Sequence, residues 1–345
     1  MAASPTPKPT RRNNTEKANP AGSPESHVGP VLLELQHWAV KFQLSKTTSI
    51  AVAYSGGADS TALLYAAAVR WPGKVTAIHI HHGLQAAADD FVRHCKAACV
   101  ALDVPLHVVR VQAKNSTGES PEDAARKARY AALAGKAVEL EIGTVALAQH
   151  ADDQVETLLL ALSRGAGVAG LAGMPAEFER FGVRFVRPLL GLGAQEIRDE
   201  LDTSGVAYIN DPTNSDLGYT RNKIRHRLLP LLAEVFPQYR ETFARSARNM
   251  ALAQEVLVQS AIELIAVTGD PPKITALQSL PRASQGNLLR HWLKAQFSVT
   301  GSEAQMNELL DQIADCTNRG KDIRIKVARG FVERRGMALA YLPSL

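Results

Sequence analysis

The sequence predicts an α/β protein in which a doubly wound parallel sheet is followed by a second, mainly helical domain. From about residue 31, short β-branched runs alternate with longer helical stretches, as they do where helices cover both faces of a parallel sheet. After residues 211–214 the alternation stops, and helical patterns rich in Arg and Leu continue to about residue 316. The 345 residues, 46% of them hydrophobic, suffice for one large domain and a smaller one.

Four strands and four helices are expected between residues 31 and 148. Buried runs predict the strands at 49–54, 75–80, 106–111 and 144–148, and amphipathic patterns predict helices at 31–44, 60–69, 86–102 and 120–137. We place a domain boundary near residue 230, giving a first domain of 31–230 and a second of 231–345. The second domain is expected to end in a short β pair formed by 323–327 and 337–342.

The first thirty residues are rich in proline, serine and basic side chains and lack apolar periodicity, so 1–30 is predicted to be a disordered tail. A transit peptide is the alternative, but its amphipathic helix would be opposed by the prolines.

The bulk composition favours a soluble protein with a mild preference for polyanionic partners. Lysine and arginine number 39 against 34 acidic residues, a net charge of +5. No uninterrupted apolar run approaches the roughly 20 residues of a spanning helix, so no membrane role is expected. Three cysteines and no visible hydrophobic signal sequence favour a reducing cytoplasm. Cys95 and Cys99, at i and i+4, are interpreted as helix packing residues, since zinc would need further ligands at matching spacing.

A glycine turn follows the first predicted strand. The segment Ser55-Gly56-Gly57-Ala58-Asp59-Ser60 places two glycines between a strand and a helix, where backbone N–H groups can converge on an anion. It lacks the Gly-Lys-Ser/Thr ending of a P-loop and the spaced glycines of a dinucleotide fingerprint. Instead, Ser-Gly-Gly-x-Asp-Ser resembles the PP-loop of the ATP pyrophosphatase superfamily, whose fold is adenine nucleotide alpha hydrolase-like.

The PP-loop resemblance implies that ATP is split between its α and β phosphates. The charged leaving group must then be neutralised by fixed N–H dipoles and by a magnesium ion. Asp59 is the leading residue for Mg²⁺ and pyrophosphate, and Ser55 and Ser60 are predicted hydroxyl donors to phosphate.

Four further segments resemble the tRNA(Ile)-lysidine synthetase family. They are 78–84 (Ile-His-Ile-His-His-Gly-Leu), 122–130, 150–157 (His-Ala-Asp-Asp-Gln-Val-Glu-Thr) and 219–230. The third is the most specific, because it continues into Arg164-Gly165-Ala166-Gly167 and Gly170-Leu171-Ala172-Gly173-Met174. The resemblance covers roughly residues 31–342, beyond which longer family members carry an additional C-terminal domain.

The resemblance implies a ligase that adenylates the wobble cytidine in the CAU anticodon of isoleucine tRNA and then joins free lysine to carbon 2. The product, lysidine, would change codon reading to AUA and charging to isoleucine. ATP would be converted to AMP and pyrophosphate with Mg²⁺, and the partners would be this tRNA and L-lysine; a homodimer is also considered.

The residues supply the charges that this reaction needs. Asp153 and Glu156 are three apart on a predicted helix and share a face, where they are predicted to bind the lysine amine and help remove its proton. Asp152 is expected to point toward Mg²⁺. Arg126 is predicted to offset phosphate charge, and Arg129 to hold the lysine carboxylate. Alternatively, these residues form ordinary surface pairs on helices.

Histidines follow two of the predicted strands. His81, with His82 beside it, and His150 are candidate contacts to ATP, or they are structural.

A basic stretch is expected to contact RNA. Between Thr220 and Met250, seven Arg and Lys residues stand against two acids. Arg221, Asn222 and Arg225 are the predicted tRNA contacts. Arg221 and Arg225 are expected to form a positive stripe on one helix face, while Ile224, Leu228 and Leu229 can face the core. The alternative is a merely solvated helix face.

Two other functions are alternatives for a chain with these motifs. A PP-loop tRNA thiolase would need a persulfide cysteine or cluster-binding thiols, and the spacing of Cys95 and Cys99 does not fit a Cys-x-x-Cys motif. A non-catalytic tRNA-binding protein would not need the set of Asp59, Asp153 and Glu156.

Overall fold

The computed structural model describes residues 29–81, 88–111, 121–316 and 322–343. The chain divides into two compact units. Unit 1 contains the residues up to Glu156 together with Pro175–Arg240, and unit 2 contains Thr157–Met174 and the residues from Glu241 onward. The chain first passes into unit 2 at Thr157, returns to unit 1 at Pro175, and passes into unit 2 again at Glu241, about eleven residues after the predicted boundary near 230. The predicted tail (1–30) falls almost entirely outside the described residues, as does His82.

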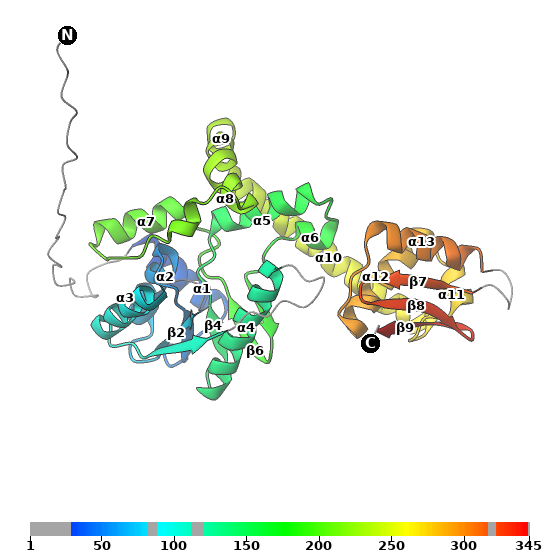
Figure 1. The fold of residues 1–345 in the computed structure, drawn as a ribbon, viewed down its shortest axis with the longest axis horizontal. Coiled ribbons are helices and arrows are strands. Elements are labelled where there is room, and N and C mark those ends of the chain that lie inside the picture. Colours follow the sequence, from blue (N-terminus) through cyan, green and yellow to red (C-terminus); the bar gives the residue numbers. More distant parts are fainter. Residues whose placement is uncertain (1–28, 82–87, 112–120, 317–321, 344–345) are drawn as a thin grey trace, which may run out of the picture. The chain divides into compact units, whose positions relative to one another are not determined.

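Unit 1 is built on a six-stranded sheet (Figure 1). Its strands, in spatial order, are β3 (Leu106–Arg110), β2 (Val75–His81), β1 (Ile50–Ala53), β4 (Thr144–Ala146), β6 (Val183–Val186) and β5 (Glu177–Arg180). Strands β1, β2, β3, β4 and β6 are parallel, which confirms the predicted doubly wound parallel sheet. Crossing from β2 and β3 on one side of β1 to β4 and β6 on the other creates a switch point beside β1, where such sheets bind ligands.

The hairpin of β5 and β6 was not predicted. Strand β5 runs antiparallel to β6 at the edge of the sheet. Phe181 and Gly182 link the two strands with φ of 53° and 73°, the positive values that a two-residue hairpin turn requires. Alternation in Val183–Val186 and the glycine before it were the available signals.

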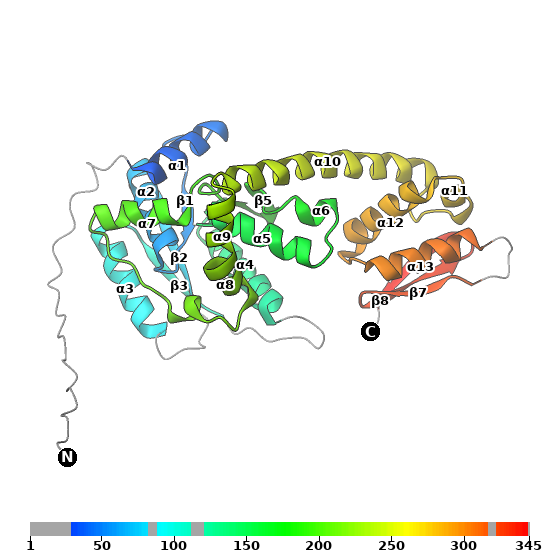
Figure 2. The ribbon, with the colours of Figure 1, turned by 90° about the horizontal axis from the view of Figure 1, so that it is seen from above.

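Helices cover both faces of the sheet (Figures 1 and 2). On one face lie α1 (Pro30–Lys41), α2 (Ala58–Arg70), α3 (Ala88–Ala101) and α7 (Ala194–Thr203), and on the other lies α4 (Pro121–Glu139). Successive β1 residues show why: Ile50 and Val52 join the first core, whereas Ala51 joins the second. Cys95 and Cys99 are free thiols buried in the first core, as packing residues would be.

Short helices complete unit 1 after α7. They are η2 (Pro212–Ser215), α8 (Thr220–Lys223), the π-helical turn η3 (Ile224–Leu228) and α9 (Leu229–Val235). Two longer helices, α5 (Ala151–Ser163) and α10 (Tyr239–Thr268), begin in unit 1 and continue into unit 2.

Unit 2 is mainly helical, as predicted. It contains α6 (Val168–Leu171), α11 (Ile274–Gln278), α12 (Arg282–Phe297) and α13 (Glu303–Ala314), in addition to most of α10. Trp292 of α12 and Leu309 of α13 pack with the sheet residues Ile325 and Val332 in one core.

The predicted terminal β pair is a three-stranded antiparallel sheet. Strands β7 (Arg324–Val327) and β9 (Ala338–Pro343) match the two expected segments, but they do not pair with each other because β8 (Gly330–Arg335) lies between them. Two-residue connections, with Ala328 at φ 49° and Gly336 at φ 65°, allow each strand to turn directly into the next.

Among the described helices, α10 alone is long and apolar enough to cross a membrane by length and composition. Two acidic residues, Glu255 and Glu263, lie within this helix and oppose insertion into a bilayer. Each charged side chain at the centre of a bilayer costs about 2.5–3.5 kcal/mol on insertion scales.

Candidate active site

The glycine turn between β1 and α2 has the tight geometry that its sequence requires. Gly56 has φ +87°, and a Cβ there would lie 3.1 Å from both Cys95 Sγ and Ile209 Cδ1. Ile209 N donates a hydrogen bond to Gly56 O at 2.8 Å, so the chain after α7 runs along the turn. Only glycine fits at this position, because a side chain would meet both neighbours and strain the backbone.

The two serines of the turn have different surroundings. Ser60 Oγ donates to Gly57 O at 3.0 Å and accepts from Ser55 N at 3.2 Å, and the residue is buried. Its single hydroxyl proton therefore holds the loop closed. Ser55 is exposed, with Oγ 3.0 Å from Ser60 Oγ, so of the two predicted phosphate donors Ser55 is the one that solvent and ligands can reach.

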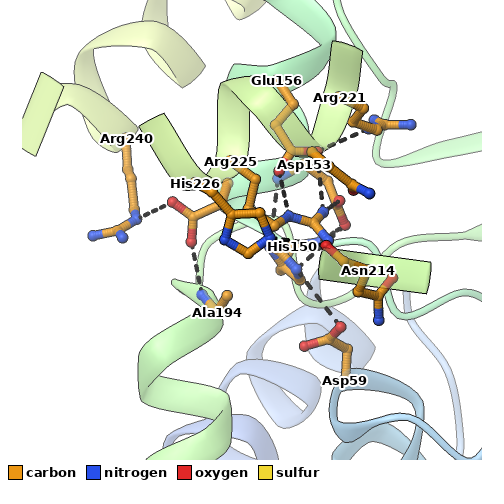
Figure 3. A network of polar contacts seen from close by, with 12 residues as sticks. Asp59, His150, Asp153, Glu156, Ala194, Asn214, Arg221, Arg225, His226 and Arg240 are labelled. Atoms are coloured by element: carbon orange, nitrogen blue, oxygen red, sulfur yellow. Dashed lines mark hydrogen bonds and ion pairs between the residues drawn. The ribbon is translucent and has the colours of Figure 1, made fainter. Parts of the chain in front are cut away.

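Asp59 lies in the first turn of α2 and points at the start of α5 (Figure 3). Its Oδ2 is 3.7 Å from His150 Nε2. Its Oδ1 is buried, and no donor of the described residues reaches it. Burial raises the pKa of Asp59, an effect that nearby His150 opposes. A buried carboxylate oxygen without a partner is what a cation site needs, so Asp59 fits the predicted magnesium role.

His150 caps the N-terminus of α5. Its ring Nδ1 accepts from Asp153 N at 3.4 Å, while Asp153 Oδ2 accepts from His150 N at 3.3 Å, the reciprocal pattern of a capping box. The other ring nitrogen, Nε2, lies between Asp59 and Asp153, 3.4 Å from Asp153 Oδ2. His150 is buried, and it joins the PP-loop carboxylate to the carboxylates of α5.

Asp153 and Glu156 share one face of α5, as predicted, and two arginines bind them (Figure 3). Glu156 is 0% exposed. Arg225 Nε donates to Glu156 Oε1 at 2.7 Å, and Arg225 Nη2 donates to Glu156 Oε2 and to Asp153 Oδ1, both at 3.1 Å. Arg221 Nε donates to Glu156 Oε2 at 2.8 Å. Burial alone would lower the pKa of Arg225, but its bonds to Glu156 outweigh this and raise the pKa.

The expected positive stripe of Arg221 and Arg225 is engaged in ion pairs within the protein. Arg221 and Arg225, predicted to face phosphates, direct their guanidinium groups at Glu156 instead. Leu229 is buried as expected, whereas Leu228 is 38% exposed. Asn222, the third predicted tRNA contact, is buried and donates to Thr213 O and Asp216 O at 2.9 and 2.8 Å.

Asp152 is surrounded by protein donors. It accepts from Ala194 N at 2.8 Å, from Tyr239 Oη at 2.7 Å and from Arg240 Nε at 2.7 Å. Burial alone would raise the pKa of Asp152, but these hydrogen bonds outweigh it and hold the pKa below its ordinary value. The donors leave the carboxylate poorly suited to the magnesium role predicted for it. Instead it joins the starts of α5, α7 and α10. Tyr239 and Arg240 lie 87 and 88 residues after Asp152, so no local pattern indicates them as its partners.

The remaining predicted residues lie on neighbouring elements. Arg126 and Arg129 are exposed on α4, and the Arg126 guanidinium lies 5.8 Å from the centre of the Tyr130 ring. His81 ends β2 at the carboxyl edge of the sheet. Across the described residues, no group of three or more His, Cys, Asp or Glu side chains is arranged as a metal cluster.

Comparison with known proteins identifies both parts of the chain. A PP-loop domain family matches residues 32–232, and a TilS substrate binding domain family matches residues 273–335. The tRNA(Ile)-lysidine synthase of Polaromonas naphthalenivorans is 55% identical over 92% of this chain and 97% of its own length. The enzyme of the same name from Burkholderia pseudomallei is 40% identical over 78% of this chain, which spans only 57% of that longer relative.

A solved structure supports the fold. A U34-tRNA thiolase from Methanococcus maripaludis, which carries a [4Fe-4S] cluster, covers 64% of this chain and 78% of its own, with a TM-score of 0.55 and 14% identity. At that identity the likeness concerns the fold alone. The PP-loop sequence, the geometry around it and the length of the match to the Polaromonas protein agree, and the chain belongs to the tRNA(Ile)-lysidine synthase family.

Proposed function

We propose that this protein uses ATP to attach lysine to carbon 2 of the wobble cytidine in the CAU anticodon of isoleucine tRNA. One observation carries the proposal beyond family membership. A continuous chain of polar contacts runs from Asp59 at the PP-loop through His150 to Asp153, and from Asp153 through Arg225 to Glu156. The group suited to ATP chemistry is thereby next to the groups suited to an amine.

The reaction has two steps. The cytosine O2 attacks the α-phosphorus of ATP, the bond to the β-phosphate breaks, and pyrophosphate leaves. The side-chain amine of lysine then attacks carbon 2, and the C–O bond breaks with AMP carrying away the former O2. The amine loses a proton in this step, so a base must stand beside it.

The first step is assigned to the PP-loop. Backbone N–H groups in the first turn of α2, at Ala58 and Asp59, stand at a helix N-terminus, where negative phosphate charge is stabilised. Ser55 is the accessible hydroxyl. A bound Mg²⁺ would supply positive charge to the phosphates, and Asp59, whose Oδ1 meets no donor in the described part of the chain, is the residue that would hold it. His150 is close enough to Asp59 to orient that carboxylate.

The second step is assigned to α5. Asp153 and Glu156 offer negative charge to the lysine ammonium, and Asp153, which is less buried than Glu156, is the proton acceptor. Arg225 acts on both carboxylates through a planar fork, which fixes their orientation. Arg126 and Arg129 on α4 are proposed to meet the α-phosphate and the lysine carboxylate.

The tRNA contacts are assigned to exposed basic residues. Of the seven basic residues in 220–250, Arg221, Arg225 and Arg240 form ion pairs within unit 1. Lys223, Arg227, Arg245 and Arg248 are exposed, so they can neutralise phosphates. Unit 2, which contains the TilS substrate binding match, is proposed to bind other parts of the tRNA. We further propose that the protein acts in the cytoplasm.

Incubation with ATP, Mg²⁺, radiolabelled lysine and isoleucine tRNA bearing a CAU anticodon tests the proposal. Label should become linked to RNA, with one pyrophosphate released per lysine joined. The matched control is the same tRNA with its wobble cytidine replaced by uridine, which should accept no lysine. An absence of RNA-linked label with the cytidine tRNA would remove the ligase assignment.

A further inference from the structure

One buried cation of unit 1 has no part in the reaction as assigned above. Arg187 immediately follows β6, at the carboxyl edge of the sheet, and is 3% exposed. Among the described residues, no carboxylate lies at ion-pair distance from its guanidinium group. Burial lowers the pKa of Arg187. Burying a charge among neutral partners is costly, so this arrangement calls for a reason beyond packing.

Three hydrogen bonds direct the guanidinium group to three different elements. Its Nε donates to Gln149 Oε1 at 3.0 Å, its Nη1 to Pro175 O at 2.6 Å, and its Nη2 to Tyr130 Oη at 3.3 Å. Gln149 immediately precedes His150, the cap of α5. Tyr130 lies on α4, and Pro175 precedes β5. Because a guanidinium group is planar and its donors are fixed, bonds in three directions set the relative positions of their acceptors.

The same group belongs to an aromatic cluster that reaches Arg126. The Arg187 guanidinium stacks 4.6 Å from the centre of the Phe178 ring. The Tyr130 ring meets Phe185 edge-on at 5.0 Å and carries the Arg126 guanidinium at 5.8 Å. Tyr130 thus bonds to Arg187 through its hydroxyl and supports Arg126 with its ring, so a shift of Tyr130 would move Arg126 as well.

We propose that Arg187 is a positioning residue that holds α4 and the start of α5, the two elements that form the proposed lysine site, at a fixed separation. Through Gln149 it places the start of α5, with His150 and Asp153. Through Tyr130 it places α4, with Arg126. Arg187 itself touches neither substrate nor ATP. The catalytic consequence of this arrangement rests on the proposed lysine ligation, whereas its structural consequence does not.

Three variants test the proposal kinetically. Arg187→Met removes the charge and all three donors at similar volume, Arg187→Lys keeps the charge without the fork, and Tyr130→Phe removes one acceptor but keeps the ring. The matched control is Arg184→Met, because Arg184 lies on β6 but pairs with Glu177 at the edge of the sheet. For Arg187→Met we expect the KM for lysine to rise and kcat to fall, with kcat/KM lower by on the order of tenfold to a hundredfold. The Kd for tRNA should stay within about twofold.

The milder variants test whether the loss of kcat/KM for lysine is caused by the loss of the Arg187 hydrogen bonds. Arg187→Lys should recover part of the loss. Tyr130→Phe should lower the same kinetic parameters by a smaller factor. In the double variant, the fold-loss in kcat/KM should be smaller than the product of the two single losses, because both substitutions remove the same hydrogen bond. The comparison requires that the wild-type enzyme forms product. If Arg187→Met then has the same kcat/KM for lysine as Arg184→Met, the proposal is overturned.

Hydrogen exchange on the ligand-free protein gives a second readout that needs no activity. Amides in the first turns of α5 (151–156) and in the middle of α4 (126–134) should exchange faster in Arg187→Met than in Arg184→Met. Equal exchange in both segments would also overturn the proposal. If the wild type joins no lysine to RNA while the exchange difference is present, the proposed function fails and the positioning role stands.

Discussion

At the scale of single residues, the site is organised around a carboxylate that solvent does not reach. Glu156 is fully buried, and its negative charge is balanced by Arg221 and Arg225. An isolated ionised carboxylate in such a place would be strongly unfavourable, so the arginines are needed for this side chain to remain inside. The same demand explains why Asp152, also buried, has three donors. Asp59 differs, because its buried Oδ1 has no hydrogen-bond partner among the described residues.

The first prediction concerns Asp59. Asp59→Ala should lower the rate of pyrophosphate release at least about a hundredfold, because it removes charge aimed at the reacting phosphates. The tRNA Kd should change by less than about twofold, since no RNA contact is assigned to this residue. Pyrophosphate release in the presence of ATP and tRNA measures the first quantity, and Asp90→Ala, on the exposed side of α3, is the control. Normal release by Asp59→Ala would contradict the assigned role.

The second prediction is the pH dependence expected from Asp152. Because its pKa is held below the ordinary 3.8 in the folded protein, the stabilisation that it provides is present above that value and is lost as the pH falls through the folded pKa. Asp152→Asn should lower the free energy of unfolding by about 1–3 kcal/mol at pH 7. The difference from wild type should shrink below about pH 4.

Urea unfolding at several pH values measures this difference. The control is Asp199→Asn on α7, where the aspartate is exposed and its change should be within about 0.5 kcal/mol. A difference for Asp152→Asn that stays constant from pH 7 down to pH 3 would show that the loss comes from packing and not from the charge.

At the scale of elements, the strand-loop-helix formed by β1, the glycine turn and α2 places the PP-loop. Its backbone is determined locally by Gly56, whose positive φ and close neighbours exclude side chains. The beginning of α5 is also local, because His150 and Asp153 cap that helix by themselves. These are the features that the sequence predicts well. The hairpin of β5 and β6 and the central strand β8 were missed, because each is a short run joined by a two-residue turn.

The third prediction belongs to the glycine turn. Gly56→Ala should lower the free energy of unfolding by about 1–2 kcal/mol for the positive φ alone, and by more because of the close contacts with Cys95 and Ile209. It should also weaken ATP binding, as titration calorimetry would show. Gly73→Ala is the control: its φ is +68°, with nothing within 4 Å of the added Cβ. Equal losses of stability and unchanged ATP binding in both variants would exclude a role for the close approach.

At the scale of the whole molecule, the question is which basic residues meet the tRNA. The sequence counts Arg221 and Arg225 with the exposed basic residues of 220–250, but their partners, Asp153 and Glu156, lie more than sixty residues earlier. The protein surface that remains for RNA is therefore smaller than the local charge suggests. Exposed arginines such as Arg245 and Arg248, three residues apart on α10, are better placed to contact phosphates.

The fourth prediction separates these two kinds of arginine. Arg225→Ala should cost about 1–3 kcal/mol of stability, because it removes hydrogen bonds from a buried carboxylate, and should raise the KM for lysine. Arg245→Ala should change stability by less than about 0.5 kcal/mol. It should weaken tRNA binding and reduce the slope of log K against log salt by about 1. Thermal unfolding measures the change in stability, and tRNA binding over a series of salt concentrations measures the salt slope. A reduced salt slope for Arg225→Ala would show that Arg225 contacts a phosphate after all.

By itself, the sequence determined the features whose causes are local: the parallel α/β alternation, the PP-loop with Gly56, Asp59 at the start of its helix, and the shared face of Asp153 and Glu156. These follow from backbone conformation and helical periodicity, which depend on neighbours in the chain. Only the tertiary structure decided which charges are paired, which oxygen of Asp59 lacks a partner among the described residues, and which distant segments Asp152 and Arg187 join by hydrogen bonds. The physical reason is that burial and partner choice depend on residues brought together from distant parts of the chain, and no local pattern records them.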